Sequence, residues 1–387
     1  ILILAAIIGA GFFFANIKGN KNEQKIDLSL NNYVAYSYQE NGELSVVNLN
    51  ENKTVSKATV GEIKTLITEN KEALDSTFNN PYKLIEKDNK IYALDFNGNI
   101  VEFEYTQKDV KETNRIATDK LPVDFKIVGN EAYVSYLNSN KIDVINLATK
   151  EKTRTFEAES EVNSFELVES YLYIGTKVGI EVLNITNISE KNVIKLDEES
   201  TTTEIFVSEY EEDLVVSEVE ENTTSNTANK DNKEAETETK TENKNDTSKT
   251  SKKKVKTVYV LNNFANDNKS SIVIKLQEGK PVDLVELKKE NPIAVTETEK
   301  FLYVACKGLE EDNKSDSVIV INKKNFKVKN KITTSDKPNF ITNMDKEIAF
   351  VSHDSGELVR INLESEDVEA SYTVPNTKGL IVKKYEK

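Results

Sequence analysis

Few residues of this chain could carry out chemistry. It has one histidine, His353, and one cysteine, Cys306. A serine or cysteine nucleophile needs a neighbouring base, usually histidine, so any catalytic triad would have to include His353. The acidic run 310–316 offers oxygen ligands for calcium, but it lacks EF-hand spacing and fits a solvated loop better. No phosphate-binding glycine loop, CxxC or HExxH is present. We therefore predict no catalytic residues, no metal site and no cofactor.

The charge balance narrows the class of partner. The 387 residues include 51 Lys and Arg against 66 Asp and Glu, a net charge of −15. Nucleic-acid binding needs a surface excess of positive charge, so we expect no nucleic-acid partner. One cysteine cannot form an intrachain disulfide, so the fold must rely on a packed core.

The N-terminus predicts a membrane segment. Residues 1–15 carry no charge, and residues 1–17 are predicted to be an apolar helix that acts as a membrane anchor or signal segment. The apolar run is shorter than the roughly 20 residues that span a bilayer, so we expect further residues before Ile1. Its three consecutive phenylalanines leave no small-residue cleavage site, which favours an uncleaved anchor over secretion after cleavage. Residues 18–31 would be a linker, which places the rest outside a bacterial membrane.

Internal repetition gives the fold class. A short strand marked by an aromatic residue is followed by a polar turn, an Ile/Val-rich strand that ends in Asn, and a further strand; residues 132–156 show the unit most clearly. The aromatic or apolar markers fall at Tyr33, Tyr92, Tyr133, Tyr173, Val215, Tyr303 and Phe350. Their spacing is close to the roughly 40–50 residues of a four-stranded propeller blade, with two exceptions. The sequence therefore predicts an all-β, seven-bladed β-propeller over residues 32–387, and we expect a monomer.

Two insertions account for the two long intervals. Residues 62–78 place their apolar side chains on one helical face, which predicts one amphipathic helix lying on the propeller. Residues 218–256 are mostly Thr, Asn, Ser, Glu and Lys, and bury too little apolar surface to offset the entropy of ordering. We predict that they form a disordered, low-complexity loop between two strands of blade five, whose role is left open.

The chain ends predict how the ring closes. Residues 379–387 supply an extra apolar strand after blade seven, whereas blade one opens directly at its second strand. We expect Leu380, Ile381 and Val382 to form the innermost strand of blade one. Residues 26–30 are the alternative for that position.

The repeat resembles a known type. The pattern of YV, a polar turn and IxVIN, clearest at 132–156 and 302–332, is similar to the YVTN-type β-propeller repeat. That resemblance implies a family that includes surface-layer proteins, secreted binding propellers and relatives of propeller lactonases. It leaves two functions open: a non-enzymatic binding or scaffold propeller, or a lactonase-like or other hydrolytic enzyme with a metal in its channel.

One set of positions is a candidate binding surface. Residues three places after the markers should form a ring near one rim, where propellers bind partners. Four of them carry aromatic or titratable side chains: Tyr36, Asp95, Tyr136 and His353. Our leading hypothesis is a membrane-anchored, extracytoplasmic propeller that presents this rim to a protein or a cell-envelope polymer.

Overall fold

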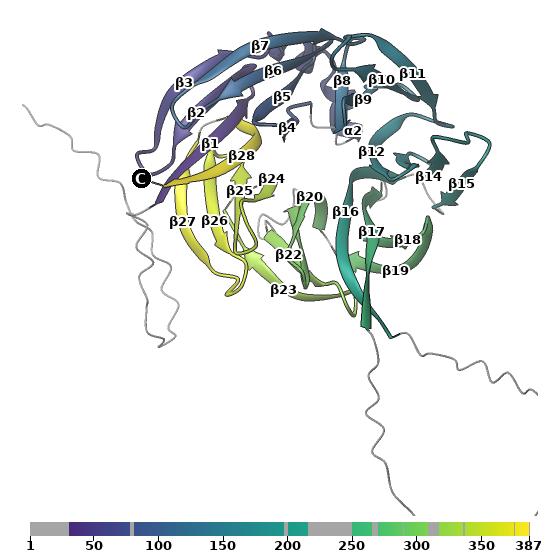
Figure 1. The fold of residues 1–387 in the computed structure, drawn as a ribbon. Helices are drawn as coiled ribbons and strands as arrows, with labels where there is room; N and C mark the ends of the chain where they lie inside the picture. The colour runs from purple at the N-terminus through teal and green to yellow at the C-terminus, as the bar shows by residue number, and fades with distance from the viewer. Residues whose placement is uncertain are drawn as a thin grey trace, which may run out of the picture.

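The chain folds into a ring of seven four-stranded antiparallel sheets, which confirms the all-β, seven-bladed propeller (Figure 1). The computed structural model describes residues 31–77, 81–196, 200–215, 250–264, 270–288, 290–308, 317–335, 337–374 and 376–386. Within these ranges the secondary structure consists of strands β1 to β28 and two short helices.

Blades one to four are named below from the centre of the ring outward. Blade one contains β28 (Thr377–Glu386), β1 (Asn31–Gln39), β2 (Glu43–Asn48) and β3 (Lys53–Thr59). Blade two contains β4 (Leu84–Lys87), β5 (Lys90–Asp95), β6 (Asn99–Tyr105) and β7 (Val110–Ala117). Blade three contains β8 (Pro122–Val128), β9 (Glu131–Tyr136), β10 (Lys141–Asn146) and β11 (Lys152–Glu157). Blade four contains β12 (Val162–Val168), β13 (Tyr171–Thr176), β14 (Gly179–Asn184) and β15 (Lys191–Lys195).

Blades five to seven repeat the same order. Blade five contains β16 (Ser200–Val215), β17 (Thr250–Phe264), β18 (Ser271–Gln277) and β19 (Lys280–Leu287). Blade six contains β20 (Glu290–Glu297), β21 (Phe301–Gly308), β22 (Ser317–Asn322) and β23 (Lys327–Thr333). Blade seven contains β24 (Pro338–Asn343), β25 (Ile348–His353), β26 (Glu357–Asn362) and β27 (Val368–Thr373).

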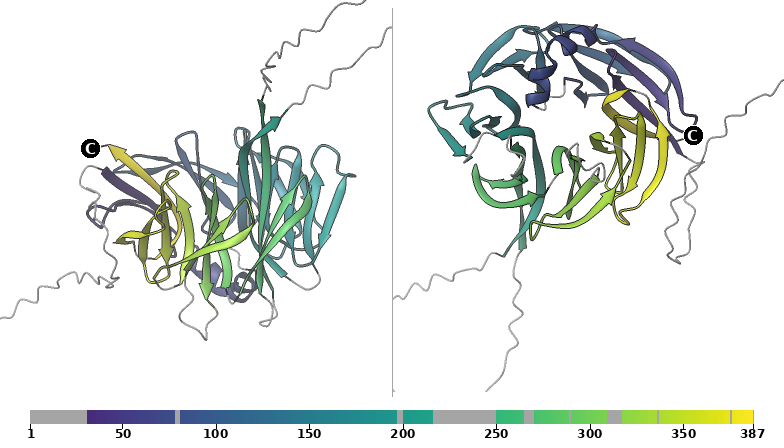
Figure 2. Two further views of the ribbon diagram at one scale, coloured as in Figure 1. Left: turned by 90° about the horizontal axis from the view of Figure 1, so that it is seen from below. Right: turned by 180° about the vertical axis from the view of Figure 1, so that it is seen from behind.

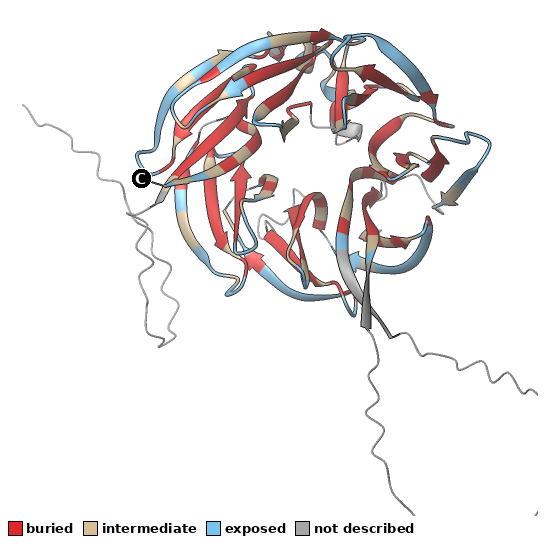
Figure 3. Ribbon diagram, viewed as in Figure 1, coloured by how far each residue is buried: buried red, intermediate tan, exposed pale blue. Residues whose placement is uncertain are grey.

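The core lies between blades rather than inside any one of them. Seven clusters of buried apolar side chains are found among the described residues, one between each pair of neighbouring blades. Burial is concentrated in the inner three strands, and the outermost strands are largely exposed (Figure 3). Because each sheet has two apolar faces, a blade buries them only when it has a neighbour on both sides.

The ring closes as predicted. β28 pairs antiparallel with β1, so that the C-terminal strand is the innermost strand of blade one. Leu380 and Val382 are buried against blade seven, and Ile381 packs on the core between blades one and two. The alternative segment, residues 26–30, lies outside the described residues, and β28 occupies the position proposed for it.

The repeat register differs from the prediction in blade one. The marker side chains Tyr92, Tyr133, Tyr173, Tyr303 and Phe350 each pack in the cluster shared with the following blade. In blade one Tyr36 takes this position, paired with Val46 as Tyr133 is paired with Val144. Tyr33 faces blade seven instead. Side chains alternate faces along a strand, so an odd shift of three residues moved the predicted marker to the wrong face.

The register also differs in blade five. Val215 lies at the end of β16, the first strand of that blade, whereas the second strand is β17 and its marker is Tyr259. The inserted segment separates these two strands and hid the correct match. β17 begins at Thr250, so residues 250–256 are strand and the predicted loop boundary of 218–256 was wrong at its C-terminal end. The cause is the pairing of residues 250–256 with β16; residues 216–249 lie outside the described residues.

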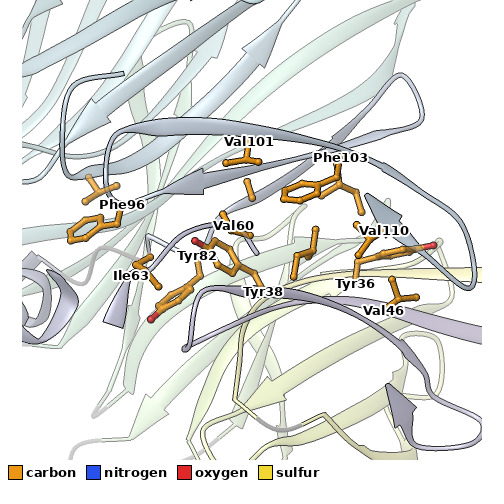
Figure 4. Close-up of a cluster of buried hydrophobic side chains, with 14 of the residues drawn as sticks. Tyr36, Tyr38, Val46, Val60, Ile63, Tyr82, Phe96, Val101, Phe103 and Val110 are labelled. Atoms are coloured by element: carbon orange, nitrogen blue, oxygen red, sulfur yellow. The ribbon is translucent and has the colours of Figure 1, made fainter. Parts of the chain in front are cut away.

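The helical insertion is broken in two. The prediction of one helix over 62–78 was wrong: α1 (Lys64–Glu69) ends at Asn70, and α2 (Lys71–Thr77) follows. The backbone of Asn70 leaves the helical region with φ of −112°, and its side-chain amide donates to the carbonyl of Leu66 at 2.8 Å, which caps the first helix. The predicted apolar face is nevertheless used, because Ile63 and Leu74 are both buried in the core between blades one and two. Figure 4 shows Ile63 beside Tyr82 in this core. Phe78 lies outside the described residues.

The two insertions emerge on opposite sides of the ring. Second strands end beside the helices, since Asp95 at the end of β5 touches Gly61 just before α1; we call this side the helix face. β16 ends and β17 begins at the other end of the strands, on what we call the arm face (Figure 2). β1 starts and β28 ends on the arm face, where Asn31 pairs with Glu386. The predicted membrane segment, residues 1–17, and the linker to residue 30 lie outside the described residues. Among the helices the structure does describe, none has the length and apolar character needed to cross a membrane.

Candidate functional site

The structure separates the four predicted binding residues into two levels. Asp95, Tyr136 and His353 occupy equivalent positions at the ends of β5, β9 and β25, next to the helix face. Tyr36 is a marker residue and lies three residues lower in its strand, roughly 10 Å away along the strand direction. The residue of blade one that belongs to the ring is Gln39. The described interactions join none of the four to another.

The corrected ring is buried throughout. Its members are Gln39, Asp95, Tyr136, Thr176, Asn262, Cys306 and His353, all at most 8% exposed. The repeat symmetry was therefore read correctly in five blades and wrongly in blades one and five. In all seven blades the side chains lie inside the blades rather than on an open rim. Binding by Tyr36, Asp95, Tyr136 and His353 stays a prediction.

Asp95 stabilises the turn of blade two. Its carboxylate accepts hydrogen bonds from the backbone N–H and side-chain amide of Asn97, at 3.0 and 2.8 Å, and from Asn99 at 3.0 Å. It also pairs with the Arg115 guanidinium at 2.8 Å. A buried carboxylate with this many donors is well satisfied, and its role in the structure is to hold the turn beside Gly61.

The two tyrosines are also engaged with protein groups. The Tyr36 hydroxyl donates to the carbonyl of Thr106 at 2.8 Å and lies 2.6 Å from the hydroxyl of Tyr385. The Tyr136 hydroxyl donates to Asp143 at 3.0 Å. Burial, and then the neighbouring Tyr385 or Asp143, raises the pKa of both phenols well above the ordinary value, so both stay protonated.

The potential nucleophile and base are also buried. The Nδ1 of His353 lies 3.2 Å from the carbonyl oxygen of Glu357, an acceptor, so this nitrogen carries the proton. Cys306 occupies the equivalent position in blade six, and its burial raises the pKa of the thiol well above its usual range. A reactive thiolate requires a lowered pKa and access to solvent, so Cys306 is poorly suited to nucleophilic chemistry.

The sequence analysis missed a cluster of charges on the inner strands. Lys83, just before β4, binds Asp124 of β8 at 2.6 Å, and Lys126 of β8 binds Glu166 of β12 at 2.6 Å. Glu204 of β16 accepts a hydrogen bond from the backbone N–H of Val295 in blade six at 2.8 Å. We call these five side chains the channel cluster. Their contacts join blade two to blade three, blade three to blade four, and blade five to blade six.

The electrostatics of the channel cluster are coupled. Burial raises the pKa of Glu204, and the positive charges of Lys83 and Lys126 offset only part of that effect. Burial of Lys126 works against its charge, but Glu166 and Asp124 outweigh it and raise its pKa. Three carboxyl groups and two ammonium groups therefore lie close enough to influence one another's charge at the inner strands of the ring.

A sequence signal for this cluster existed. Asp124, Ser164 and Glu204 follow a bulge at the same register of β8, β12 and β16, and Lys126 and Glu166 lie two residues further on. Polar residues inside otherwise apolar inner strands were the clue, although the sequence could not show that they converge.

Two further observations concern ligands. Asn163, the bulge residue of β12, is 2% exposed, and neither atom of its amide group has a hydrogen-bond partner. In the described part of the chain, no group of three or more His, Cys, Asp and Glu side chains has an arrangement that could hold a metal ion. The acidic run 310–316 lies outside the described ranges.

The ring of seven four-stranded sheets defines the class as a seven-bladed β-propeller. No family model matches the sequence, so the resemblance to the YVTN-type repeat is not supported by a family assignment. No curated protein matches it either.

Solved structures support the fold. Hydrazine synthase from Kuenenia stuttgartiensis is similar with a TM-score of 0.57 and 10% identity over 78% of this chain and 89% of that one. Dihydro-heme d1 dehydrogenase NirN in complex with DHE is similar with a TM-score of 0.54 and 10% identity, over 91% of this chain and 75% of that one. A chain of the mitotic checkpoint complex is similar with a TM-score of 0.51 and 11% identity, over 78% of this chain and 82% of that one. These proteins differ in function, and identities this low establish the architecture alone.

Proposed function

We propose that this chain is a non-enzymatic binding or scaffold propeller, held outside a bacterial membrane by residues 1–17, that presents its helix face to a protein or a cell-envelope polymer. The observation that carries the proposal is the α1–α2 insertion. These helices are not needed to complete any blade, yet they are packed firmly on the ring by Ile63 and Leu74. α2 also contacts β16 of blade five, so it reaches across the centre of the ring from the segment between blades one and two. An added element fixed on one face of a closed ring is suited to recognition.

The placement of the chain ends agrees with this arrangement. β1 begins on the arm face, so an anchor that precedes it would leave the helix face directed away from the membrane. The exposed residues Thr65, Glu69, Lys71 and Glu72 would then be available to a partner. The net charge of −15 again disfavours nucleic acid as that partner.

The first test is location. Cells that express the chain with residues 1–17 intact should hold it in the membrane fraction, and external protease should reach it once the outer barriers are opened. A matched chain that starts at residue 18 should be lost from the membrane fraction. Recovery of both forms in the cytoplasm would overturn the proposed location.

The second test asks whether the helix face is the surface that binds the partner. Glu69→Lys/Glu72→Lys reverses two exposed charges on the helices, and Glu364→Lys/Ser365→Lys makes a similar change on the arm face. After crosslinking on intact cells, a partner should be captured by the wild type and the arm-face variant and lost from the helix-face variant. Equal capture by both variants would contradict the helix face as the binding surface.

A hydrolytic propeller, as in lactonase-like relatives, is the second candidate. The observation that favours it is the raised pKa of Glu204 beside two lysines in the channel, because perturbed carboxyl groups cluster at functional sites. Purified chain should then hydrolyse simple lactones, and Glu204→Gln should abolish that activity while the fold is retained. Absence of hydrolysis, together with no bound metal by elemental analysis, would remove this candidate.

A further inference from the structure

Most inner strands have a β-bulge near the helix face, and in two blades the bulge residue bonds to the next blade. Thr203, the bulge residue of β16, donates its hydroxyl to the carbonyl of Pro292 in blade six at 2.9 Å. Asn339, the bulge residue of β24, donates its side-chain amide to the carbonyl of Thr377 in blade one at 3.1 Å. Each of these carbonyls belongs to the residue just before the bulge of the receiving strand. The repeat therefore directs a bulge side chain across the seam to the following blade.

Asn163 is the bulge residue of blade four, and it departs from this pattern. The equivalent acceptor is the carbonyl of Thr202 in blade five, but neither atom of the Asn163 amide has a hydrogen-bond partner, and the residue is only 2% exposed. The seam itself is tight, since β12 packs on β16 and a Cβ added to Gly175 of blade four would meet the Thr202 side chain at 2.3 Å. Buried polar groups are nearly always paired, so this amide requires an explanation such as a ligand.

Glu204 lies two residues beyond Thr202 and is the incompletely paired member of the channel cluster. The other four members form two close ion pairs. One oxygen of Glu204, Oε2, accepts from the backbone N–H of Val295. The other, Oε1, accepts no hydrogen bond within the described part of the chain and is not sealed from solvent. Three carboxylates against two ammonium groups leave the cluster with one negative charge in excess.

This excess charge sets the chemistry of a ligand. Burial raises the pKa of Glu204, and Lys83 and Lys126 offset it only in part because Asp124 acts against them. A cation beside Glu204 would neutralise the cluster. A primary ammonium group brings three N–H donors with its charge, and charge-assisted hydrogen bonds are the stronger kind. The open acceptors on either side of the seam, Glu204 Oε1 and Asn163 Oδ1, match such a donor.

We propose that Asn163 and Glu204 form a site at the seam of blades four and five that binds a small molecule carrying a primary ammonium group. The ammonium group donates to Glu204 Oε1 and Asn163 Oδ1, and a hydroxyl next to it on the ligand accepts from Asn163 Nδ2. Both ends of the buried amide are then paired. The site lies on the inner strands, so it goes beyond the helix-face surface proposed above and does not rest on it.

The test is isothermal titration calorimetry of the full chain at pH 7 and low salt, with ethanolamine as the probe. Ethanolamine should bind saturably, in the millimolar range expected for so small a ligand. Choline has the same hydroxyl and charge but no N–H donor, and ethylene glycol has no charge, so each should bind about tenfold more weakly or less. Sodium chloride at the same ionic strength should give no saturable heat. Absence of saturable ethanolamine binding, or equal binding of choline or sodium, would overturn the proposal.

Two variants locate the site. Glu204→Gln and Asn163→Leu should each weaken ethanolamine binding by about tenfold or more, because Glu204→Gln removes the negative charge and Asn163→Leu removes the amide acceptor. Glu209→Gln is the matched control: it makes the same change on the same strand outside the channel cluster, where the side chain is exposed, and should bind as the wild type does.

A melting transition retained in both site variants shows that the ring is intact. Wild-type affinity in both would contradict the proposed site. The outcome is separate from the helix-face partner and from hydrolysis by Glu204, because calorimetry with ethanolamine detects binding without either.

Discussion

Blades one and five each pair an inner strand with a second strand that is not joined to it by a short turn, yet the two cases differ in what the pairing does. In blade one, β28 and β1 come from opposite ends of the chain, and their pairing closes the ring, together with the apolar core between blades seven and one. In blade five, β16 and β17 are separated by residues 216–249, but the chain itself still joins them. A long separation in sequence therefore matters for stability when it closes the ring, and much less when it only lengthens a hairpin.

Both inner strands are tied to the adjacent blade. Gly379 of β28 lies against the carbonyl of Tyr82, so closely that an added Cβ would meet its oxygen at 1.8 Å. In blade five, Glu204 accepts from Val295 N–H and the Thr203 hydroxyl donates to the Pro292 carbonyl at 2.9 Å. These contacts lie near the helix face, far from the insertion, which explains how blade five tolerates the insertion.

Removing β28 should have the largest effect. Deletion of residues 379–387 takes away two buried side chains, Leu380 and Val382, and exposes the core between blades seven and one. We expect Tm to fall by about 10 °C or more, or the cooperative transition to be lost. Calorimetry measures this directly, and an unchanged melting transition would contradict closure by β28.

Gly379→Ala should be the next most damaging change. The new methyl group would overlap the Tyr82 backbone, which cannot move aside as a side chain could, so we expect a loss of about 2–4 kcal/mol in the free energy of unfolding. Gly129→Ala is the matched control: nothing lies within 4 Å of its added Cβ, and its φ of +58° predicts a cost of about 1 kcal/mol. Equal losses in urea unfolding would show that the approach of β28 to blade two is not tight.

Glu204→Gln should have a smaller, pH-dependent effect. Because burial raises the folded-state pKa of Glu204, the ionised form destabilises the fold; stability from this group is fully present below the unfolded value near 4.5 and is lost as pH rises through the folded pKa. The variant should therefore be more stable than the wild type at pH 7, by on the order of 1 kcal/mol, and equal to it below about pH 4.

Glu209→Gln, further along the same strand, should change the free energy of unfolding in the opposite direction: the variant should be less stable than the wild type at neutral pH. The hydrogen bond from Lys254 lowers the pKa of Glu209, so its stabilising effect is present above the unfolded value and is lost as pH falls through the folded pKa. Thermal unfolding from pH 3 to 8 compares the two variants. A wild type more stable than Glu204→Gln at pH 7 would show that the carboxylate is well stabilised in the channel.

Removal of the insertion should have the smallest effect. Replacing residues 216–249 with Asn-Gly joins Val215 to Thr250 by a two-residue turn suited to a hairpin. Loop closure depends weakly on length, so Tm should change by no more than about 2 °C. A large fall in Tm, measured by calorimetry, would contradict the proposed difference between blades one and five.

Local patterns were sufficient to predict most of the fold. The alternating strands of blade three, the two insertions and the final strand at Leu380 were found because strand alternation and repeat period are encoded in neighbouring residues. The same reasoning failed at Tyr33, where a shift of three residues keeps an aromatic residue in place but reverses its face. It failed at Val215 because the insertion interrupted the repeat.

The sequence by itself determined seven repeating units and a closing strand, because each blade must bury two apolar faces against its neighbours. Only the tertiary structure decided which charges meet at the centre. Lys83 and Asp124, or Lys126 and Glu166, come from different blades, and they are brought together by the curvature of the ring. It also decided that the ring of Asp95, Tyr136 and His353 is buried, since exposure at a strand end depends on the turns and helices that cover it.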